Sequence, residues 1–228
     1  MTLKELKEFL DVKVIQYNKP DFIESDPLQI PHCYSLKEDI EISGFLTATI
    51  AWGNRKSIIN NANRMMQMLE HSPHDFVINH QETDLENLET FVHRTFNGFD
   101  FITFIKALQH IYKHHHGLEA VFSAANESES LQQAIHHFKT VFFEIEHLTR
   151  TEKHVSDPLK NSAAKRLNMF LRWMVRSNAK GVDFGLWSSI PPSALMVPLD
   201  VHTGNTARTL NLLIRKQNDW KTNEEIFR

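Results

Sequence analysis

The sequence predicts an all-α protein, and three observations support this prediction. Only seven glycines and eight prolines occur among 228 residues. Leu, Ala, Met, Lys, Glu and Gln, which favour helix interiors, are common. Apolar residues also recur three and four positions apart, as they do on one face of a helix. The length suits a single unit over residues 1–228 with a substantial core.

The first helices are expected in the following order. Residues 2–17 have the pattern of a surface helix, and three prolines within residues 18–35 predict a loop. A helix that starts after Ser35 turns from acidic to apolar, so its second half is expected in the core. Gly53 ends this helix, and Asn54 is placed to cap a third one.

Helical patterns continue at residues 84–96, 98–116 and 129–150, and the acidic segment 126–130 is expected to interrupt them. His110 and His114 lie four positions apart on one helical face, a spacing that a metal could bridge. More histidines follow directly before a glycine, and this favours a solvated helix end. We therefore expect no metal site.

Positive charge gathers in one segment of the chain. Residues 1–148 carry 12 Lys and Arg against 21 Asp and Glu, whereas residues 149–180 carry eight basic side chains against two acidic ones. A local basic region on an acidic body fits a phosphate-binding face. A solvated helical face with ordinary charges would give the same pattern.

Several classes of protein are excluded or not expected. Cys33 is the only cysteine, so the chain alone can build neither a disulfide nor a cysteine-ligated zinc or iron–sulfur site. No apolar run is long enough for a membrane span, and the amphipathic start does not resemble a signal peptide. We expect a cytoplasmic protein, associated with the nucleoid if it binds DNA.

The stretch from Asn161 to Leu213 holds residue types that chemistry requires. Lys165 lies on the first turn of a largely apolar helix, expected over about residues 162–176. A half-buried lysine near a carboxylate can act as a nucleophile. Asp200 precedes a further helix, where capping would hold it fixed and ionised, ready to stabilise a cation or accept a proton. Capping alone would also account for this aspartate.

The order of these parts resembles the helix-hairpin-helix DNA glycosylases. Three segments carry the resemblance, GFLTATIAWGNRKSIINNANRMM, KRLNMFLRWM and VPLDVHTGNTARTLNLL, and the last is similar to the segment with the family's catalytic aspartate. The separation of Lys165 and Asp200 is most similar to the archaeal 8-oxoguanine glycosylase branch. HRTFNGFDF, LRWMVR and DFGLWSSIPPSALMVPLDVHTG also resemble an uncharacterised bacterial family related to that branch.

The resemblance implies a fold of two helical lobes with a cleft between them. Residues 38–148 would form the central lobe, and residues 1–37 with 149–228 would form the second. The family's glycine-rich hairpin is replaced here by SDPLKNSAAK, so Lys160 competes with Lys165 for the role of nucleophile.

The same resemblance implies a DNA-repair N-glycosylase with lyase activity that acts as a monomer on double-stranded DNA and needs no cofactor. Lys165 would attack the sugar and form a Schiff base, assisted by Asp200. The damaged base, for example an oxidised purine, would be flipped out of the duplex. The expected base pocket consists of Trp52, Trp173 and Trp187. The residues expected to contact phosphates are Arg55, Lys160, Arg166, Arg172, Lys180 and His202.

Two other interpretations stay open. A non-catalytic DNA-binding protein of the same fold would show salt-sensitive affinity without strand cleavage. A histidine-rich metal-dependent hydrolase would require stoichiometric zinc, manganese or iron.

Overall fold

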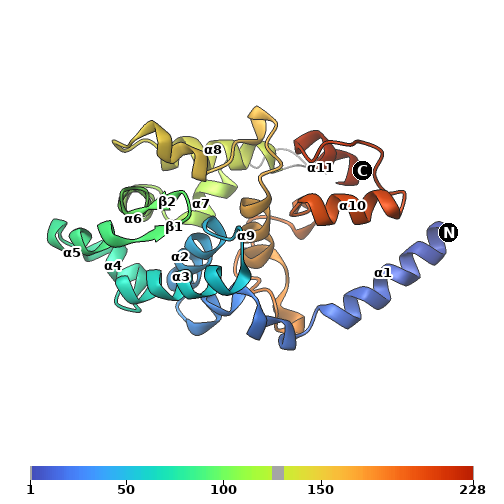
Figure 1. Ribbon diagram of the computed structural model, residues 1–228, viewed down its shortest axis with the longest axis horizontal. Coiled ribbons are helices and arrows are strands. Elements are labelled where there is room, and N and C mark those ends of the chain that lie inside the picture. Colours follow the sequence, from blue (N-terminus) through green and yellow to red (C-terminus); the bar gives the residue numbers. More distant parts are fainter. Residues whose placement is uncertain (1, 125–130, 228) are drawn as a thin grey trace.

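The computed structural model describes residues 2–124 and 131–227, and these residues are mostly helical (Figure 1). The interruption predicted at 126–130 lies outside the described residues. A small hairpin is the exception to the all-helical prediction: β1 (Val92–His93) pairs antiparallel with β2 (Phe96–Asn97). Arg94, at the turn, has a left-handed φ of 56°, and a helix cannot continue through that conformation.

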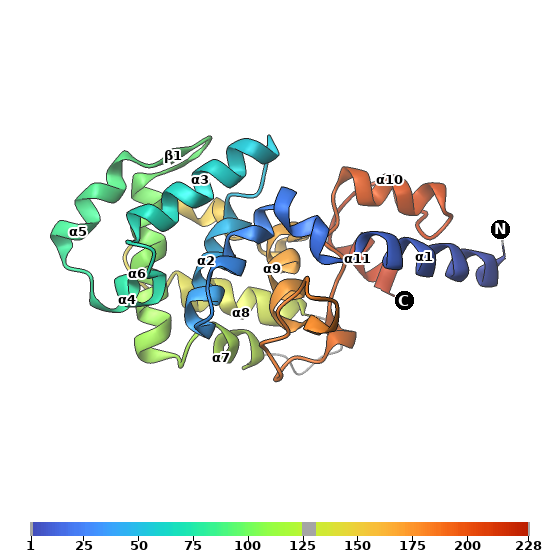
Figure 2. The ribbon, with the colours of Figure 1, turned by 90° about the horizontal axis from the view of Figure 1, so that it is seen from below.

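The first helix, α1 (Leu3–Tyr17), confirms the predicted surface helix. The side chain of Thr2 caps it in a reciprocal pair with Glu5, and Leu6 is its only buried residue. In both ribbon views α1 projects from the body at the end of the molecule that carries α10 and α11 (Figures 1 and 2). The proline-rich segment that follows forms short 3-10 turns, η1 (Pro20–Ser25), η2 (Pro27–Gln29) and η3 (Pro31–Cys33).

Helix α2 (Lys37–Thr49) lies at the centre of the molecule, and every residue from Ile40 to Thr49 is buried. The ring of Phe45 packs against aromatic rings of three helices, α6 (Gly98–His114), α8 (Gln132–Phe142) and α9 (Lys165–Val175). Gly44 has no side chain, so α9 packs closely against α2 at that point. The predicted burial of the second half of this helix is confirmed.

Two of the remaining helices of the first half, α3 (Arg55–Met68) and α4 (Pro73–Asn79), pack against α2. Asn54 accepts the N–H of Ser57 at 3.1 Å, so the predicted cap of the third helix is confirmed. The other remaining helices are α5 (Glu82–Glu86), η4 (Asn87–Thr90) and α7 (Leu118–Ser123).

The second half of the chain returns to α2 and then continues to the far end of the molecule. The helix predicted over about 162–176 starts at Lys165, because residues 158–164 form a tight turn instead. The other elements here are η5 (Thr149–His154), η6 (Pro158–Lys160), η7 (Asn178–Lys180), η8 (Pro192–Ala194), α10 (Val201–Thr209) and α11 (Trp220–Phe227). Figure 2 shows α10 and α11 beside α9 and away from α4 and α5.

One hydrophobic cluster extends from Leu28 to Trp220 and includes residues of both predicted lobes. The division into lobes stays a prediction. Among the described residues, no helix combines the length and the apolar character needed to cross a membrane.

Candidate functional site

Lys165 and Asp200 meet where two helices begin. Lys165 is the first residue of α9, and Asp200 is the N-cap of α10. The Lys165 Nζ lies 2.9 Å from Asp200 Oδ2, and the two side chains are 39% and 29% exposed. The pair is therefore accessible from solvent, as a nucleophile and its assisting carboxylate must be.

The two oxygens of the Asp200 carboxylate have different partners. Oδ1 accepts the N–H of Thr203 at 2.9 Å, which confirms the predicted cap, and Oδ2 faces Lys165. Partial burial acts to raise the pKa of Asp200, but the hydrogen bonds from Lys165 and Thr203 outweigh it and lower the pKa to about 2. Asp200 is thus an anion at neutral pH, which suits stabilisation of a positive charge better than uptake of a proton.

A tight turn over residues 158–164 leads into Lys165. Asn161 and Ala164 both have left-handed φ angles, 63° and 46°. Such angles are uncommon for residues other than glycine, and most of all for alanine, which has no polar group to compensate. Ser162 Oγ accepts the N–H of Ala164 at 3.2 Å and so helps to hold this conformation.

Helix α11 also holds this turn in place. The amide of Asn223 donates to the carbonyl of Ala163 at 3.2 Å, and the amide of Asn161 donates to Asp219 Oδ2 at 3.1 Å. The N–H of Trp220 donates to the carbonyl of Asn161 at 3.3 Å. The position of Lys165 therefore depends on residues more than fifty positions later in the chain.

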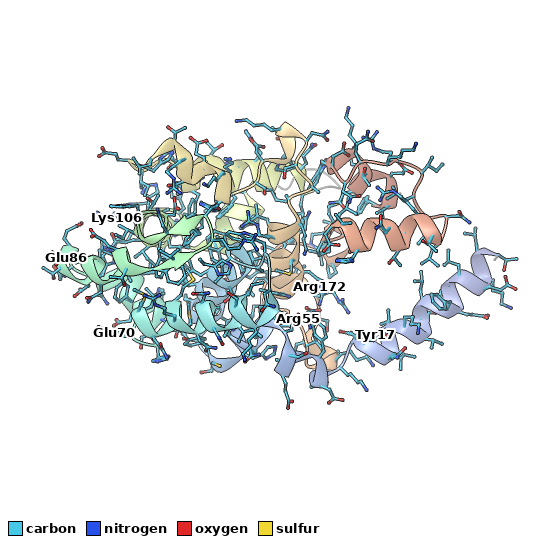
Figure 3. All side chains as sticks on the ribbon, viewed as in Figure 1. Tyr17, Arg55, Glu70, Glu86, Lys106 and Arg172 are labelled. Carbon is cyan, nitrogen blue, oxygen red and sulfur yellow. The ribbon has the colours of Figure 1, made fainter. Side chains whose placement is uncertain are left out.

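The Lys165–Asp200 pair lines a cavity of about 700 Å³, which we call the lysine cavity. Trp52 and Arg55 come to it from the corner between α2 and α3. Figure 3 labels Arg55 in the middle of the molecule, next to α9. The residues predicted from the sequence that line this cavity are Trp52, Arg55, Lys165, Arg166, Trp173, Asp200 and His202.

Arg166 is a cation without a carboxylate partner among the described residues. Its guanidinium lies 4.9 Å from the ring centroid of Trp52 and donates to two backbone carbonyls, those of Thr49 and His154. Burial lowers the pKa of Arg166 to about 10, so the side chain still carries its charge at neutral pH. Because carbonyls neutralise a cation only in part, positive potential is left for an anion in the cavity.

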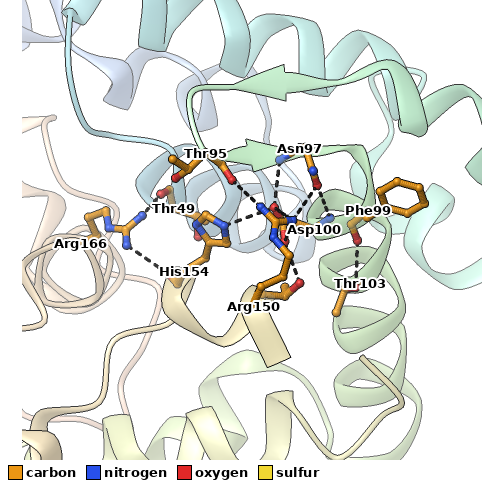
Figure 4. A network of polar contacts seen from close by, with 10 residues as sticks. Thr49, Thr95, Asn97, Phe99, Asp100, Thr103, Arg150, His154 and Arg166 are labelled. Atoms are coloured by element: carbon orange, nitrogen blue, oxygen red, sulfur yellow. Dashed lines mark hydrogen bonds and ion pairs between the residues drawn. The ribbon is translucent and has the colours of Figure 1, made fainter. Parts of the chain in front are cut away.

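A network of polar contacts around the buried Asp100 holds the segment that Arg166 contacts (Figure 4). Asp100, at the start of α6, accepts hydrogen bonds from Thr151 at 2.7 Å and from Arg150 at 3.0 Å, and its carboxylate lies 3.3 Å from His154 Nε2. Burial alone would raise the pKa of Asp100, but the nearby His154 and the hydrogen bonds from Thr151 and from a backbone N–H lower the pKa to about 2. The Asp100 carboxylate thus holds η5 in place, and with it the carbonyl of His154 that Arg166 contacts.

The other predicted site residues lie outside the lining of the lysine cavity. Trp187 is buried in the core, where its Nε1 donates to Glu41 at 2.6 Å. Arg172 pairs with Asp183 at 3.2 Å. Lys160 and Lys180 are exposed on η6 and η7.

Asp26 is a cavity residue that the sequence did not single out. It caps η2 by accepting the N–H of Leu28 at 3.0 Å. It also lines the lysine cavity, together with the oppositely charged Arg55 and Lys165. Burial raises the pKa of Asp26 above its usual value, although that N–H and the nearby cations act to lower it. The cavity thus holds two carboxylates whose pKa values are shifted in opposite directions.

A repeat in the sequence is a signal that could have found Asp26. The tetrapeptide SDPL occurs at residues 25–28 and again at residues 156–159. In both copies the aspartate caps a 3-10 turn through the N–H two positions later. Ser156 and Asp26, from the two copies, both line the lysine cavity.

Fold and site together define a mostly helical protein with a lysine–aspartate pair at a cationic, aromatic-lined cavity. Residues 26–228 match the family described as "Protein of unknown function (DUF2400)", and the chain belongs to this family. The match covers every residue that lines the lysine cavity and leaves α1 outside. No curated protein and no solved structure matches the chain.

Proposed function

We propose that this protein is a DNA-repair N-glycosylase with lyase activity, and that the lysine cavity is its active site. The distance of 2.9 Å between Lys165 and Asp200, at a cavity that solvent can enter, is the observation that carries the proposal. The resemblance of the surrounding segments to helix-hairpin-helix glycosylases supports the same chemistry.

In the proposed reaction, Lys165 Nζ loses a proton and forms a bond to the sugar carbon C1′. The bond between C1′ and the base nitrogen breaks, and the base leaves with a proton. Asp200 is an anion with a pKa of about 2, so its role is to stabilise the positive charge that develops on the sugar. Ring opening then gives a Schiff base, and loss of a C2′ proton breaks the 3′ carbon–oxygen bond of the strand.

Asp26 is suited to a different role in this reaction. A carboxylate that burial makes more basic is a better proton acceptor than Asp200. Both Asp26 and Lys165 line the lysine cavity, and the lysine charge acts on the Asp26 carboxyl. We assign Asp26 the task of taking up the proton that Lys165 must lose.

Arg166, Arg55 and His202 would contact the phosphates of the DNA, and Trp52 or Trp173 would pack against the flipped base. The guanidinium of Arg166 is well placed for this because its protein partners are carbonyls. Lys160, Lys180 and Arg172 lie outside the cavity lining, so any phosphate contact they make would involve DNA that extends beyond the cavity.

Borohydride trapping tests the proposal. A duplex that contains an abasic site reports the lysine chemistry without knowledge of the lesion, and a duplex with 8-oxoguanine adds base removal. We expect a covalent complex with the wild type, loss of that complex in Lys165→Ala, and its retention in the matched control Lys160→Ala. Asp200→Asn keeps the cap oxygen but removes the charge, so it should slow trapping on the 8-oxoguanine duplex by on the order of 10²-fold.

Two results would overturn the assignment. Trapping that persists in Lys165→Ala and vanishes in Lys160→Ala would move the nucleophile to Lys160. No trapping with either duplex would remove the lyase activity from the proposal.

A non-catalytic DNA-binding protein is the second candidate, and the ion pair between Lys165 and Asp200 favours it. An ion pair holds the lysine as an ammonium group, which has no free electron pair with which to attack the sugar. This candidate predicts DNA affinity that falls steeply with salt, and no strand cleavage.

A further inference from the structure

Three potential metal ligands converge at the C-terminal end of α6, away from the lysine cavity. His110 Nε2 lies 2.9 Å from Glu144 Oε2, His115 Nε2 lies 3.2 Å from the same oxygen, and the two ring nitrogens lie 3.1 Å apart. The three atoms therefore form a nearly equilateral triangle. None of these residues lines the lysine cavity.

The backbone brings His115 back toward His110. Helix α6 ends at His114, and His115 is its C-cap, with its N–H donating to the carbonyl of Ile111 at 2.8 Å. The φ of His115 is −125°, far from the helical value of about −63°, so its side chain leaves the helical path. The helical spacing of the sequence points to His110 and His114, and it misses His115 because His115 is not in a helical conformation.

Glu144 reaches the same point from another helix. It lies in the turn directly after α8, where its N–H donates to the carbonyl of Val141 at 3.2 Å. A glutamate side chain is an anion at neutral pH, and this is the form that a metal ion binds.

Hydrogen bonds alone satisfy this triangle poorly. Each ring nitrogen has one in-plane position, which holds either a proton or a lone pair. A nitrogen that points at Glu144 cannot also point at the other imidazole, so one side of the triangle stays without a bond. A single cation above the triangle would satisfy all three atoms at once.

We propose that His110, His115 and Glu144 bind a divalent first-row transition metal ion, with Zn²⁺ as the representative case. Two imidazoles and one carboxylate form a donor set that zinc and ferrous iron both accept. With metal–ligand bonds of about 2.1 Å, neighbouring ligand atoms lie about 3.0 Å apart in octahedral geometry and about 3.4 Å apart in tetrahedral geometry. The observed separations of 2.9, 3.1 and 3.2 Å fall in or next to this interval.

The site would join two helix ends and keep open coordination positions. The side chains of His110, His115 and Glu144 are 25%, 32% and 43% exposed, so water can complete the coordination shell. His110 also lines a second cavity of about 580 Å³ next to the triangle. A bound metal would clip the end of α6 to the segment after α8 at the mouth of that cavity.

Zinc titration of the full chain tests this site. Protein stripped with a chelator is titrated with Zn²⁺ against a chromogenic competitor, and thermal unfolding is measured with and without zinc. We expect one tight zinc per chain and a zinc-dependent rise in Tm, because the ion binds the folded state. His115→Ala and Glu144→Gln should weaken zinc binding at least about tenfold and abolish the rise.

His71→Asn is the matched control for the many histidines of the chain. His71 is exposed and has a left-handed φ of 55°, which asparagine accepts readily. This variant should bind zinc as the wild type does. X-ray absorption of the zinc-loaded wild type gives a measurement that needs no variant, and it should show two imidazole ligands.

The proposal fails if the wild type binds no stoichiometric zinc. It also fails if His115→Ala and Glu144→Gln bind zinc as tightly as the wild type, which is the result expected for a hydrogen-bonded cluster with adventitious metal elsewhere. X-ray absorption without imidazole ligands would overturn it as well.

Discussion

Replacement of Asp100 by asparagine should remove an acid-sensitive part of the protein's stability. The carboxylate is fully buried and has a pKa of about 2 in the folded protein, against an ordinary value of 3.8. Because the folded pKa is the lower one, the ionised form favours folding, and the benefit is lost as pH falls.

The size of the effect follows from the two pKa values. At 1.36 kcal/mol for each pKa unit, the shift corresponds to about 2 kcal/mol above pH 5, where the group is ionised in both states. Of this, about 1 kcal/mol is lost between pH 5 and pH 3, and the rest at still lower pH.

Urea unfolding of the wild type and of Asp100→Asn, from pH 7 to pH 3, measures this term. The difference in unfolding free energy between the two proteins cancels the carboxylates they share, Asp200 among them. We expect that difference to be constant above pH 5 and to shrink by about 1 kcal/mol by pH 3. A difference that is independent of pH over this interval would refute the assignment of the low pKa to Asp100.

Two further substitutions test the packing. Gly98→Ala should destabilise the protein by about 1–3 kcal/mol in thermal or urea unfolding, because its methyl group would overlap the backbone of Glu89; an unchanged Tm would show that the two segments can separate at no cost. Trp187→Phe removes the donor that lies 2.6 Å from the buried carboxylate of Glu41, and it should cost about 1–3 kcal/mol. Burial raises the pKa of Glu41 even in the wild type, so Glu41 takes up a proton as the pH falls and then needs the donor less. The difference in stability between the wild type and Trp187→Phe should therefore be smaller at low pH than at neutral pH. The opposite pH trend would contradict the role of Trp187 as a donor to an ionised Glu41.

The elements with strong local signals could be predicted from the sequence. Asn54 and Asp200 are helix caps because their side chains bond N–H groups three positions later, an interaction that involves only neighbours in the chain. The burial of α2 follows in the same way from its second half, which is mostly apolar. The apolar spacing of residues 84–96 predicts a helix, but residues 92–97 form a hairpin, because this spacing fits a turn as well as a helix.

The site could be predicted only in part, because long-range contacts complete it. Lys165, Asp200, Trp52 and Arg55 were found through their residue types and their places at helix starts. The carbonyl partners of Arg166 depend on backbone positions that no sequence pattern specifies. The SDPL repeat marks Asp26 as a cap, but only the folded chain shows that it lines the lysine cavity. A tryptophan such as Trp187 could stack on a base, but the Nε1 of Trp187 donates a hydrogen bond to the buried Glu41, and this holds the side chain in the core.

The hold of α11 on the turn before Lys165 also bears on the order in which the protein is assembled. The chain is synthesised from its N-terminus, so the helices around Phe45 can pack before Asp219 and Asn223 exist. Until those residues arrive, the left-handed turn at Ala164 lacks the partners that fix it. The part of the core around Phe45 can therefore form early in synthesis, whereas the lysine reaches its place beside Asp200 only in the last stage.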